Sequence, residues 1–166
     1  MSTKSSTFVT NKPVRRLSEA LYLFAITLWV GGMWAIGYLT APVLFSSLGD
    51  RQLAGMVAGK LFALIGWVGL GCAAYLLVFL LSRWGARFFK SGVFWLVVAM
   101  ALMTAASQFG IQPLMAQLKA DAFPREVMES VMRDRFATWH GASSILYLMQ
   151  SLLGVWLVVW SGRGLK

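Results

Sequence analysis

Seven polar residues have the types and the spacing of a hydrogen-bonding site. In the segment "RFATWHGASSILYLMQ" the polar side chains recur every three or four residues, as on one face of a helix, and two glutamines lie four residues apart near the end of the preceding apolar segment. Imidazole, hydroxyl and amide groups can hold a small polar molecule or an ion by hydrogen bonding. We name this set the candidate recess; it comprises His140, Ser143, Ser144, Tyr147, Gln150, Gln108 and Gln112.

The same residues also suit a purely structural role. Polar side chains that face lipid are costly, so the face that carries them must point into a helix bundle. There they can form hydrogen bonds between helices, and the serines can return their hydroxyls to the backbone. Two interpretations therefore stay open: a closed polar seam, or a cleft that is floored by Gln150 and gated by His140.

The residue types give little support for a metal site or a catalytic site. His140 is the only histidine and Cys72 the only cysteine, whereas a zinc site needs three or four protein ligands and a bis-histidine haem needs two histidines. The nine methionines are scattered, and no serine has an activating partner within reach of the pattern. We therefore predict no cofactor and no metal site, and we identify no catalytic residue.

The composition is that of an integral membrane protein. Of the 166 residues 58% are hydrophobic and 13% are charged, against about 25% charged in soluble domains, and the mean hydropathy is +0.69. The formal charge of +9 would suit nucleic acid. However, the basic residues flank apolar segments, so the predicted partner is the lipid bilayer and not nucleic acid.

Four apolar segments are long enough to cross a bilayer, and they predict an all-α polytopic four-helix bundle in a single domain, 1–166. Glu19, at the start of the first, is the only charged residue within them. Because intramembrane carboxylates mark proton pathways, their absence deeper in the spans argues against a proton-coupled pump. The expected spans are 17–39, 61–81, 92–111 and 141–160.

The distribution of lysine and arginine predicts the orientation, since positive residues favour the cytoplasmic side. One side carries a net charge of +8, from Lys4, Lys12, Arg15, Arg16, Arg83, Arg87, Lys90, Arg163 and Lys166 with Glu19. The other side nets +1, from Arg51, Lys60, Lys119, Arg125, Arg133 and Arg135 with Asp50, Asp121, Glu126, Glu129 and Asp134. We therefore expect a multi-pass protein of the bacterial inner (plasma) membrane, with both termini cytoplasmic and His140 on the outer side.

The two outer connections have recognisable helix signals. Pro42 should end or kink the first helix, and Asp50 should cap a second helix that begins near Arg51, before the apolar span itself. Between spans three and four, apolar residues at helical spacing predict an amphipathic helix over about 124–139. This helix either lies on the outer surface or runs straight into span four.

Small residues should let the helices approach closely. In lipid, association depends on close packing, so glycines spaced three or four apart predict contact faces. The glycines concerned are Gly31, Gly32, Gly55, Gly59, Gly66 and Gly69. Pro113, like Pro42, predicts a kink, because it cannot donate to the carbonyl four residues earlier, that of Phe109.

Four segments together resemble the transmembrane protein 205-like family of small four-span membrane proteins. They are "APVLFSSL", "AGMVAGKLFALIGW", "TAASQFGIQPLMAQL" and "RFATWHGASSILYL", and the likeness extends from about Leu21 to Leu153. The resemblance implies four spans and no established activity, and its aromatic-His-Gly-x-Ser-Ser pattern matches Trp139, His140, Gly141, Ser143 and Ser144. A looser likeness reaches copper-resistance-type proteins and the four-helix protoporphyrinogen oxidase family. The latter uses a histidine in its early helices, which this sequence lacks.

Three functions follow as hypotheses. The first is the handling of a small molecule or ion in a recess between helices that is open to the outer side. The second is a scaffold or assembly partner, with the chain itself or other membrane proteins as partners and the polar face as a structural seam. A haem-linked redox enzyme is the least favoured, because the sequence offers no second axial histidine.

Overall fold

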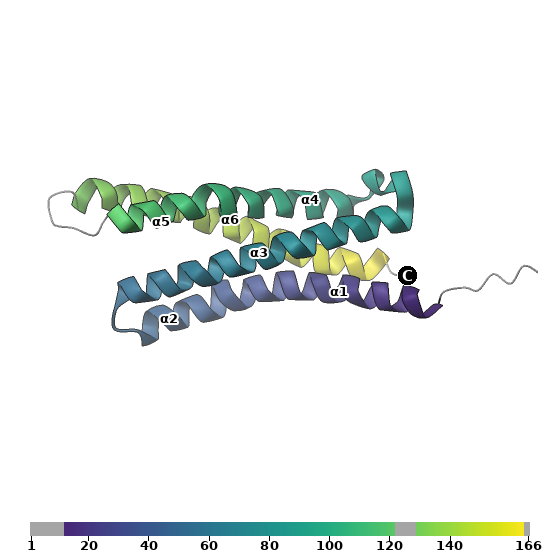
Figure 1. Ribbon diagram of the computed structural model, residues 1–166, viewed down its shortest axis with the longest axis horizontal. Coiled ribbons are helices and arrows are strands. Elements are labelled where there is room, and N and C mark those ends of the chain that lie inside the picture. The colour runs from purple at the N-terminus through teal and green to yellow at the C-terminus, as the bar shows by residue number, and fades with distance from the viewer. Residues whose placement is uncertain (1–11, 122–128, 165–166) are drawn as a thin grey trace, which may run out of the picture.

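The structure is a computed structural model that describes residues 12–121 and 129–164. All elements in these two ranges are helices (Figure 1). In chain order they are α1 (Lys12–Trp34), the π-helix η1 (Ala35–Thr40), α2 (Ala41–Ser47), α3 (Arg51–Trp84), the 3-10 helix η2 (Gly85–Lys90), α4 (Gly92–Ala105), the π-helix η3 (Ala106–Ile111), α5 (Gln112–Asp121) and α6 (Glu129–Gly164).

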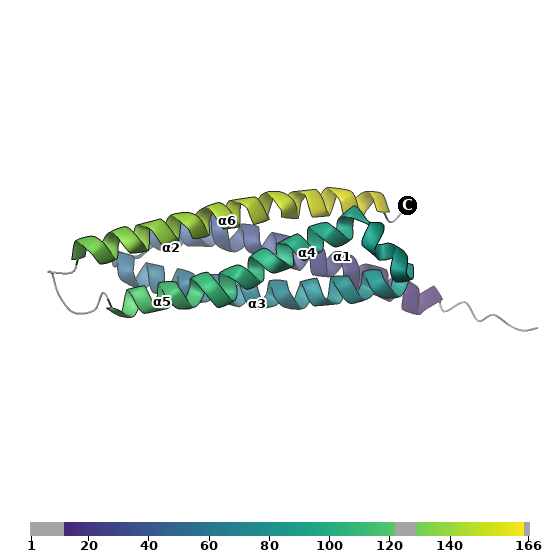
Figure 2. The same cartoon turned by 90° about the horizontal axis from the view of Figure 1, so that it is seen from above.

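These elements join into four long rods. The first consists of α1, η1 and α2, the second of α3, the third of α4, η3 and α5, and the fourth of α6 (Figure 2). By length and composition each is able to cross a membrane, over Arg15–Ser47, Arg51–Arg83, Gly92–Gln117 and Ala137–Gly162. The all-α four-helix bundle is confirmed, and the chain is a multi-pass membrane protein.

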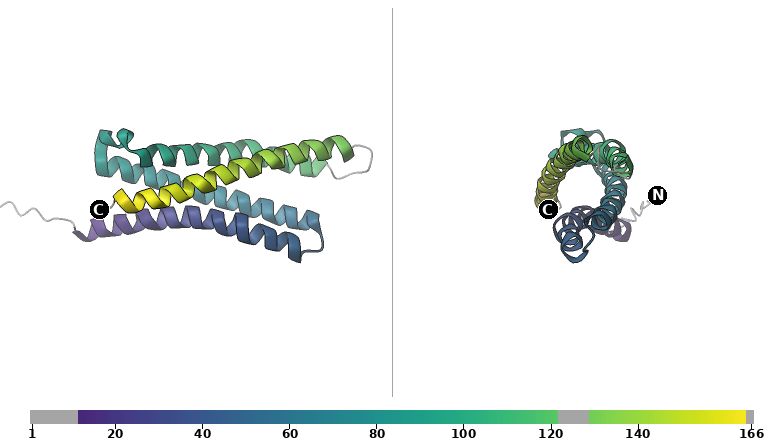
Figure 3. Two further views of the ribbon diagram at one scale, coloured as in Figure 1. Left: turned by 180° about the vertical axis from the view of Figure 1, so that it is seen from behind. Right: turned by 90° about the vertical axis from the view of Figure 1, so that its left-hand side faces the viewer.

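The rods form a ring. Within the described residues α1 packs against α3 and α6, and α4 packs against the same two helices, so that an end-on view is nearly circular (Figure 3). We call the end where α1 begins and α6 stops the terminal end, and the end where α2 turns into α3 the tip end. Each rod accordingly has a terminal half and a tip half.

The helix that forms the second span begins where the sequence predicts. The carboxylate of Asp50 accepts hydrogen bonds from the backbone amides of Gln52 and Leu53, at 2.8 and 3.2 Å, and so caps α3 at Arg51. At its other end Gly85 has a φ of 52°, a left-handed value that glycine adopts without steric cost. The 34 residues of α3 therefore extend beyond the apolar segment 61–81 at the tip end.

The core lies mainly in the terminal half. Its fully buried large side chains are Trp29, Leu76, Val97, Met100 and Leu157, which come from all four rods. Toward the tip end, by contrast, the buried residues of α3 that precede Ile65 are small, since they are alanines at positions 54 and 58. The bundle is therefore held most densely near the terminal end.

Several of the predicted glycine contacts are present. A Cβ added to Gly69 would meet the Trp29 indole closer than 3.0 Å, and one added to Gly32 would lie 2.5 Å from Ile65. Gly55 and Gly59 are half-buried, and Gly55 faces Phe45 at a distance of 3.9 Å. A Cβ at Gly31 would meet no described atom within 4 Å, so the structure gives no packing role to that residue.

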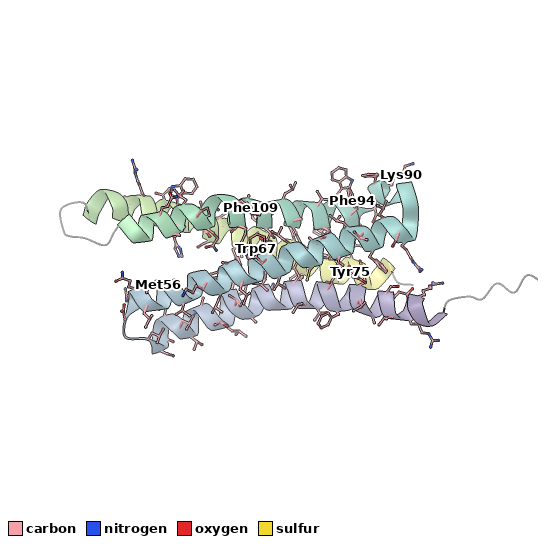
Figure 4. All side chains as sticks on the ribbon, viewed as in Figure 1. Met56, Trp67, Tyr75, Lys90, Phe94 and Phe109 are labelled. Atoms are coloured by element: carbon pink, nitrogen blue, oxygen red, sulfur yellow. The ribbon has the colours of Figure 1, made fainter. Side chains whose placement is uncertain are left out.

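The outer surface of the bundle is apolar. Leu64, Trp67, Leu102, Phe109 and Leu152 are each more than half exposed. Trp67 and Phe109 project from neighbouring rods and their rings meet edge to face at 5.6 Å (Figure 4). Such a surface suits acyl chains and agrees with a bilayer environment.

The segment before the fourth span is continuous with it. In the described residues α6 runs without a break from Glu129 to Gly164, so residues 129–139 continue into the span instead of forming a separate surface helix. The part of the expected amphipathic helix over 124–128 lies outside the described residues. The first and third rods are also longer than the sequence predicts, and each contains a π-helix just before its proline.

Candidate functional site

Gln150 lies at the centre of the bundle and makes a bond between two helices. Its side chain is 5% exposed, and its Nε2 donates to the hydroxyl of Thr104 on α4 at 2.5 Å. Thr104 is itself buried and donates to the carbonyl of Met100 at 2.8 Å. The amide is therefore part of a chain of hydrogen bonds that joins α6 to the backbone of α4.

Tyr147 lies one turn closer to the tip end and reaches the backbone of the first rod. Its hydroxyl donates to the carbonyl of Met33 at 2.5 Å. In a regular α-helix this carbonyl and the amide four residues later would bond to each other. The tyrosine therefore occupies a backbone acceptor of α1 directly before η1 begins.

Gly37 leaves the space that this tyrosine needs. A Cβ at Gly37 would lie closer than 3.0 Å to the ring of Tyr147. The ring is further held by Phe62 on α3, edge to face at 5.2 Å, and by Tyr38, whose centroid lies at 6.3 Å. The first, second and fourth rods thus meet around one aromatic side chain.

Gln108 makes the corresponding contact on the opposite side of the bundle. It lies in η3, and its Nε2 donates to the carbonyl of Ala63 on α3 at 3.1 Å. Gly66, one turn further along α3, leaves room for this amide, because a Cβ there would lie closer than 3.0 Å to its Oε1. Gln108 is half-buried, as is Gln112 one turn nearer the tip end.

The remaining residues of the candidate recess lie toward the tip end of α6. Ser143 is half-buried, whereas Ser144 and His140 are exposed. The hydroxyl of Ser144 donates to the carbonyl of His140 at 2.8 Å, and that of Ser151, further down the helix, donates to Tyr147 at 2.8 Å. The polar face is therefore buried and bonded near mid-span and becomes accessible toward the tip.

A second polar group is buried near the middle of the bundle. The indole Nε1 of Trp29 is the one fully buried side-chain nitrogen or oxygen without a hydrogen-bond partner in the described ranges. It faces the helix backbone at Gly69, where there is no side chain.

The terminal end carries its own polar contacts. Tyr22 donates to the hydroxyl of Ser161 at 3.1 Å, and Tyr75 donates to the carbonyl of Ser18 at 3.3 Å. Glu19 accepts from Arg15 at 3.1 Å and lies 3.4 Å from Arg83. This carboxylate therefore joins α1 to α3 near the terminal end of the bundle.

Nothing in the described ranges forms a cluster of three or more histidine, cysteine and acidic residues that could hold a metal ion. What the site can do chemically is donate and accept neutral hydrogen bonds. It has amides, hydroxyls and backbone carbonyls around aromatic rings. Such groups are suited to recognition and to helix registration.

Comparison with known protein families identifies one that matches the sequence. The model of a family described as a domain of unknown function, DUF4149, matches residues 24–124. The chain belongs to this family. No curated protein and no solved structure matches it.

The DUF4149 match divides the site in two. It includes the acceptors Met33 and Thr104, on the first and third rods, but it ends before α6. Tyr147 and Gln150, which reach those acceptors, lie outside the matched segment. The fourth rod of this DUF4149 protein therefore supplies the polar donors to backbone and side-chain acceptors that lie within the matched domain.

Two participants were not identified from the sequence of this DUF4149 protein. Thr104 is a lone hydroxyl in an apolar run, and such residues ordinarily bond to their own helix. The Met33 carbonyl carries no signal in its residue type, because every residue has one. The signal that could have located it is Gly37, four residues beyond Met33, because a glycine permits the close approach that Tyr147 makes there.

Proposed function

We propose that this protein binds a small molecule or ion in a recess between the tip halves of its rods. The observation that supports this is the packing of the tip end. Within the described residues α2 packs against α3 and η1, and α5 packs against α6 and η3, while the two pairs diverge toward the tip end (Figure 1). Ser143 and Gln112 lie in this half of the bundle and are half-buried.

The chemistry of these side chains limits the ligand. The recess has amide and hydroxyl groups beside aromatic rings, and no lysine, arginine or acidic residue is among its members. A neutral polar molecule, or an ion held by carbonyl and amide oxygens, fits such groups better than a strongly charged organic ligand does. His140, which is exposed at the tip side, would stand at the mouth.

The orientation is part of the proposal. The positive charge gathers at the terminal end, where Arg15 and Arg83 lie beside Glu19. We place this end in the cytoplasm of an inner (plasma) membrane, so that the recess opens to the outer side. We also propose the finer relationship to the transmembrane protein 205-like family, on the four segments quoted above.

Cysteine labelling tests the recess directly. In a Cys72→Ala background, Ser143→Cys should react with a water-soluble methanethiosulfonate reagent about tenfold faster than Ile145→Cys, because only a hydrated thiol ionises readily. Ile145 is 63% exposed on the same helix and serves as the lipid-facing control. Equal and slow reaction at both positions would show that the tip half is dry, and the recess would have to be abandoned.

A scaffold is the second candidate, and a specific observation favours it. Tyr147, Gln150 and Gln108 all use their donors in bonds between helices, as a structural seam requires. Such a bundle would present its apolar outer surface to itself or to other membrane proteins. Native mass spectrometry after gentle solubilisation should then show a stable complex, and a lone monomer would count against this function.

A further inference from the structure

The chain consists of two similar halves. Each half has a rod that is interrupted by a π-helix of six residues, and then a long uninterrupted helix. In both interrupted rods the proline is the second residue after the π-helix, at Pro42 and Pro113. We call residues 12–84 and 92–164 the two repeats.

The contacts between rods follow this repetition. In each repeat the interrupted rod packs against its own long helix, α1 on α3 and α4 on α6. Between the repeats, α3 packs on α4 and α6 packs on α1. The two repeats are thus related by an approximate two-fold axis along the bundle, and they share two interfaces.

Proline accounts for the interruptions. In an α-helix its ring would clash with the carbonyl four residues earlier, and it has no amide hydrogen to donate. Widening the turn removes that clash, and the last π-type bonds run from Ala41 to the Ile36 carbonyl and from Gln112 to the Ser107 carbonyl, directly before each proline. Such π-segments are frequent where helices carry a function.

Near the π-helices, each interface between the repeats has one hydrogen bond from a side chain to a backbone carbonyl. Tyr147 bonds to Met33 across the interface of α6 with α1, and Gln108 bonds to Ala63 across that of η3 with α3. Each bond is received beside a glycine, Gly37 or Gly66. We call these two bonds the clasps.

On the terminal side of the clasps the repeats are packed closely. Fully buried side chains from all four rods fill this half, and Tyr22 bonds to Ser161 across the interface of α1 with α6. On the tip side, in the described part of the chain, α2 and α5 each pack mainly against helices of their own repeat. A motion that separates the repeats therefore meets least resistance at the tip end.

We propose that the two repeats rock about their terminal half, and that the Tyr147 and Gln108 clasps hold them in the closed position. Release of the clasps widens the space between the tip halves. Rocking of one structural repeat against another, about interrupted helices, is an established way to gate a site inside a membrane. This inference rests on the proposed function, because the motion would regulate access to the recess proposed there.

Distance measurements between spin labels test the motion without any ligand. In a Cys72→Ala background one label pair joins the repeats at the tip end, at Ser47→Cys and Gln117→Cys. A second pair joins them at the terminal end, at Ser82→Cys and Gly162→Cys; all four positions are exposed. The clasp variants are Tyr147→Phe and Tyr147→Phe with Gln108→Leu. Tyr75→Phe is the matched control, since it removes a tyrosine bond to a carbonyl within one repeat.

We expect the clasp variants to add a tip-end population that is longer by about 2 Å or more, with the terminal pair unchanged. Tyr75→Phe should leave both pairs as in the parent. The proposal is overturned if Tyr147→Phe leaves the tip pair unchanged, or if Tyr75→Phe lengthens it equally. Because Tyr147→Phe alone keeps the ring and its contacts, it carries the test should the double variant not fold.

Labelling of Ser143→Cys, combined with the same clasp variants, separates this proposal from the proposed function. A lengthened tip pair without any change in the labelling rate of Ser143→Cys would support rocking and contradict a hydrated recess. Faster labelling without a change in distance would support the recess and overturn the clasps.

Discussion

The polar side chains inside this bundle act mainly through the backbone of neighbouring rods. Tyr147 and Gln108 donate to carbonyls, and Gln150 reaches the backbone of α4 through the hydroxyl of Thr104. In lipid each such bond is worth only about 0.6 kcal/mol on average, so it specifies position more than it adds stability. A buried group that loses its partner costs more, about 1–3 kcal/mol.

The bond between Gln150 and Thr104 gives a prediction at this scale. Thr104→Val should lower the free energy of unfolding by about 1–3 kcal/mol, because it leaves the buried Gln150 amide without this acceptor. Gln150→Leu should cost less, about 0.5–1.5 kcal/mol, because the Thr104 hydroxyl still donates to the Met100 carbonyl. The double variant should lose less than the sum, with a coupling of about 0.5–1.7 kcal/mol. Denaturation in mixed micelles, followed by circular dichroism, gives the free energy of unfolding of the parent, the two single variants and the double variant.

Thr27→Val is the matched control for this cycle. Thr27 also donates to the carbonyl four residues earlier, that of Leu23, but it is exposed on the outside of α1. Its replacement should change stability by no more than about 0.5 kcal/mol. Additive losses in the double variant would mean that Gln150 and Thr104 do not depend on each other.

The sequence predicted which side chains point inward but not what they contact. Helical spacing placed Tyr147 and Gln150 on one face, and the cost of polar groups in lipid turned that face toward the bundle. The partners depend on the relative height and rotation of the rods. The height and rotation of each rod result from many weak contacts, so they cannot be predicted from any single residue type.

At the scale of elements, glycines decide how close α3 lies to its neighbours. Gly66 and Gly69 receive Gln108 and Trp29, whereas a Cβ at Gly71 would meet no described atom within 4 Å. The three positions lie within two turns of one helix, so they share backbone environment and depth. They therefore separate the effect of contact from that of helix propensity.

Alanine at these positions should give opposite results. Gly71→Ala should be neutral or should stabilise the protein by up to about 1 kcal/mol, because alanine favours the helix. Gly69→Ala should lower stability by about 1–3 kcal/mol, since the Trp29 indole is fully buried and has little room to move. Thermal unfolding in detergent compares the two, and equal effects would exclude a specific contact at Gly69.

The two rods that contain π-helices show which features could not be predicted from the sequence. Pro42 and Pro113 predicted a kink in each rod, because proline has no amide hydrogen to donate to the carbonyl four residues earlier. The structure resolves this missing bond by a widened turn, after which the helix continues as α2 or α5. The widened turn of the first rod also meets Tyr147, which comes from a rod more than 100 residues away along the chain, and local sequence does not show such a contact. By contrast the Asp50 cap was predictable, because it involves only adjacent residues.

At the scale of the whole molecule, the asymmetry of charge predicts one orientation in the membrane. Both the start of α1 and the end of α6 lie at the terminal end, and so do the arginines beside Glu19 (Figure 3). Transfer of this end across a bilayer would move its positive charges with it, which the membrane insertion machinery disfavours. Two glycines in open space allow a matched pair of probes: Gly49 at the tip end and Gly162 at the terminal end.

In intact cells that express the Cys72→Ala protein, Gly49→Cys should react with a membrane-impermeant maleimide, and Gly162→Cys should react only after the cells are opened. Neither substitution adds a clash, because a Cβ at either position would meet no described atom within 4 Å. Reaction of Gly162→Cys in intact cells would reverse the orientation and would turn the recess toward the cytoplasm. Reaction of both residues in intact cells would mean that the chain inserts in two orientations, and the charge difference between its ends would then be too small to choose one.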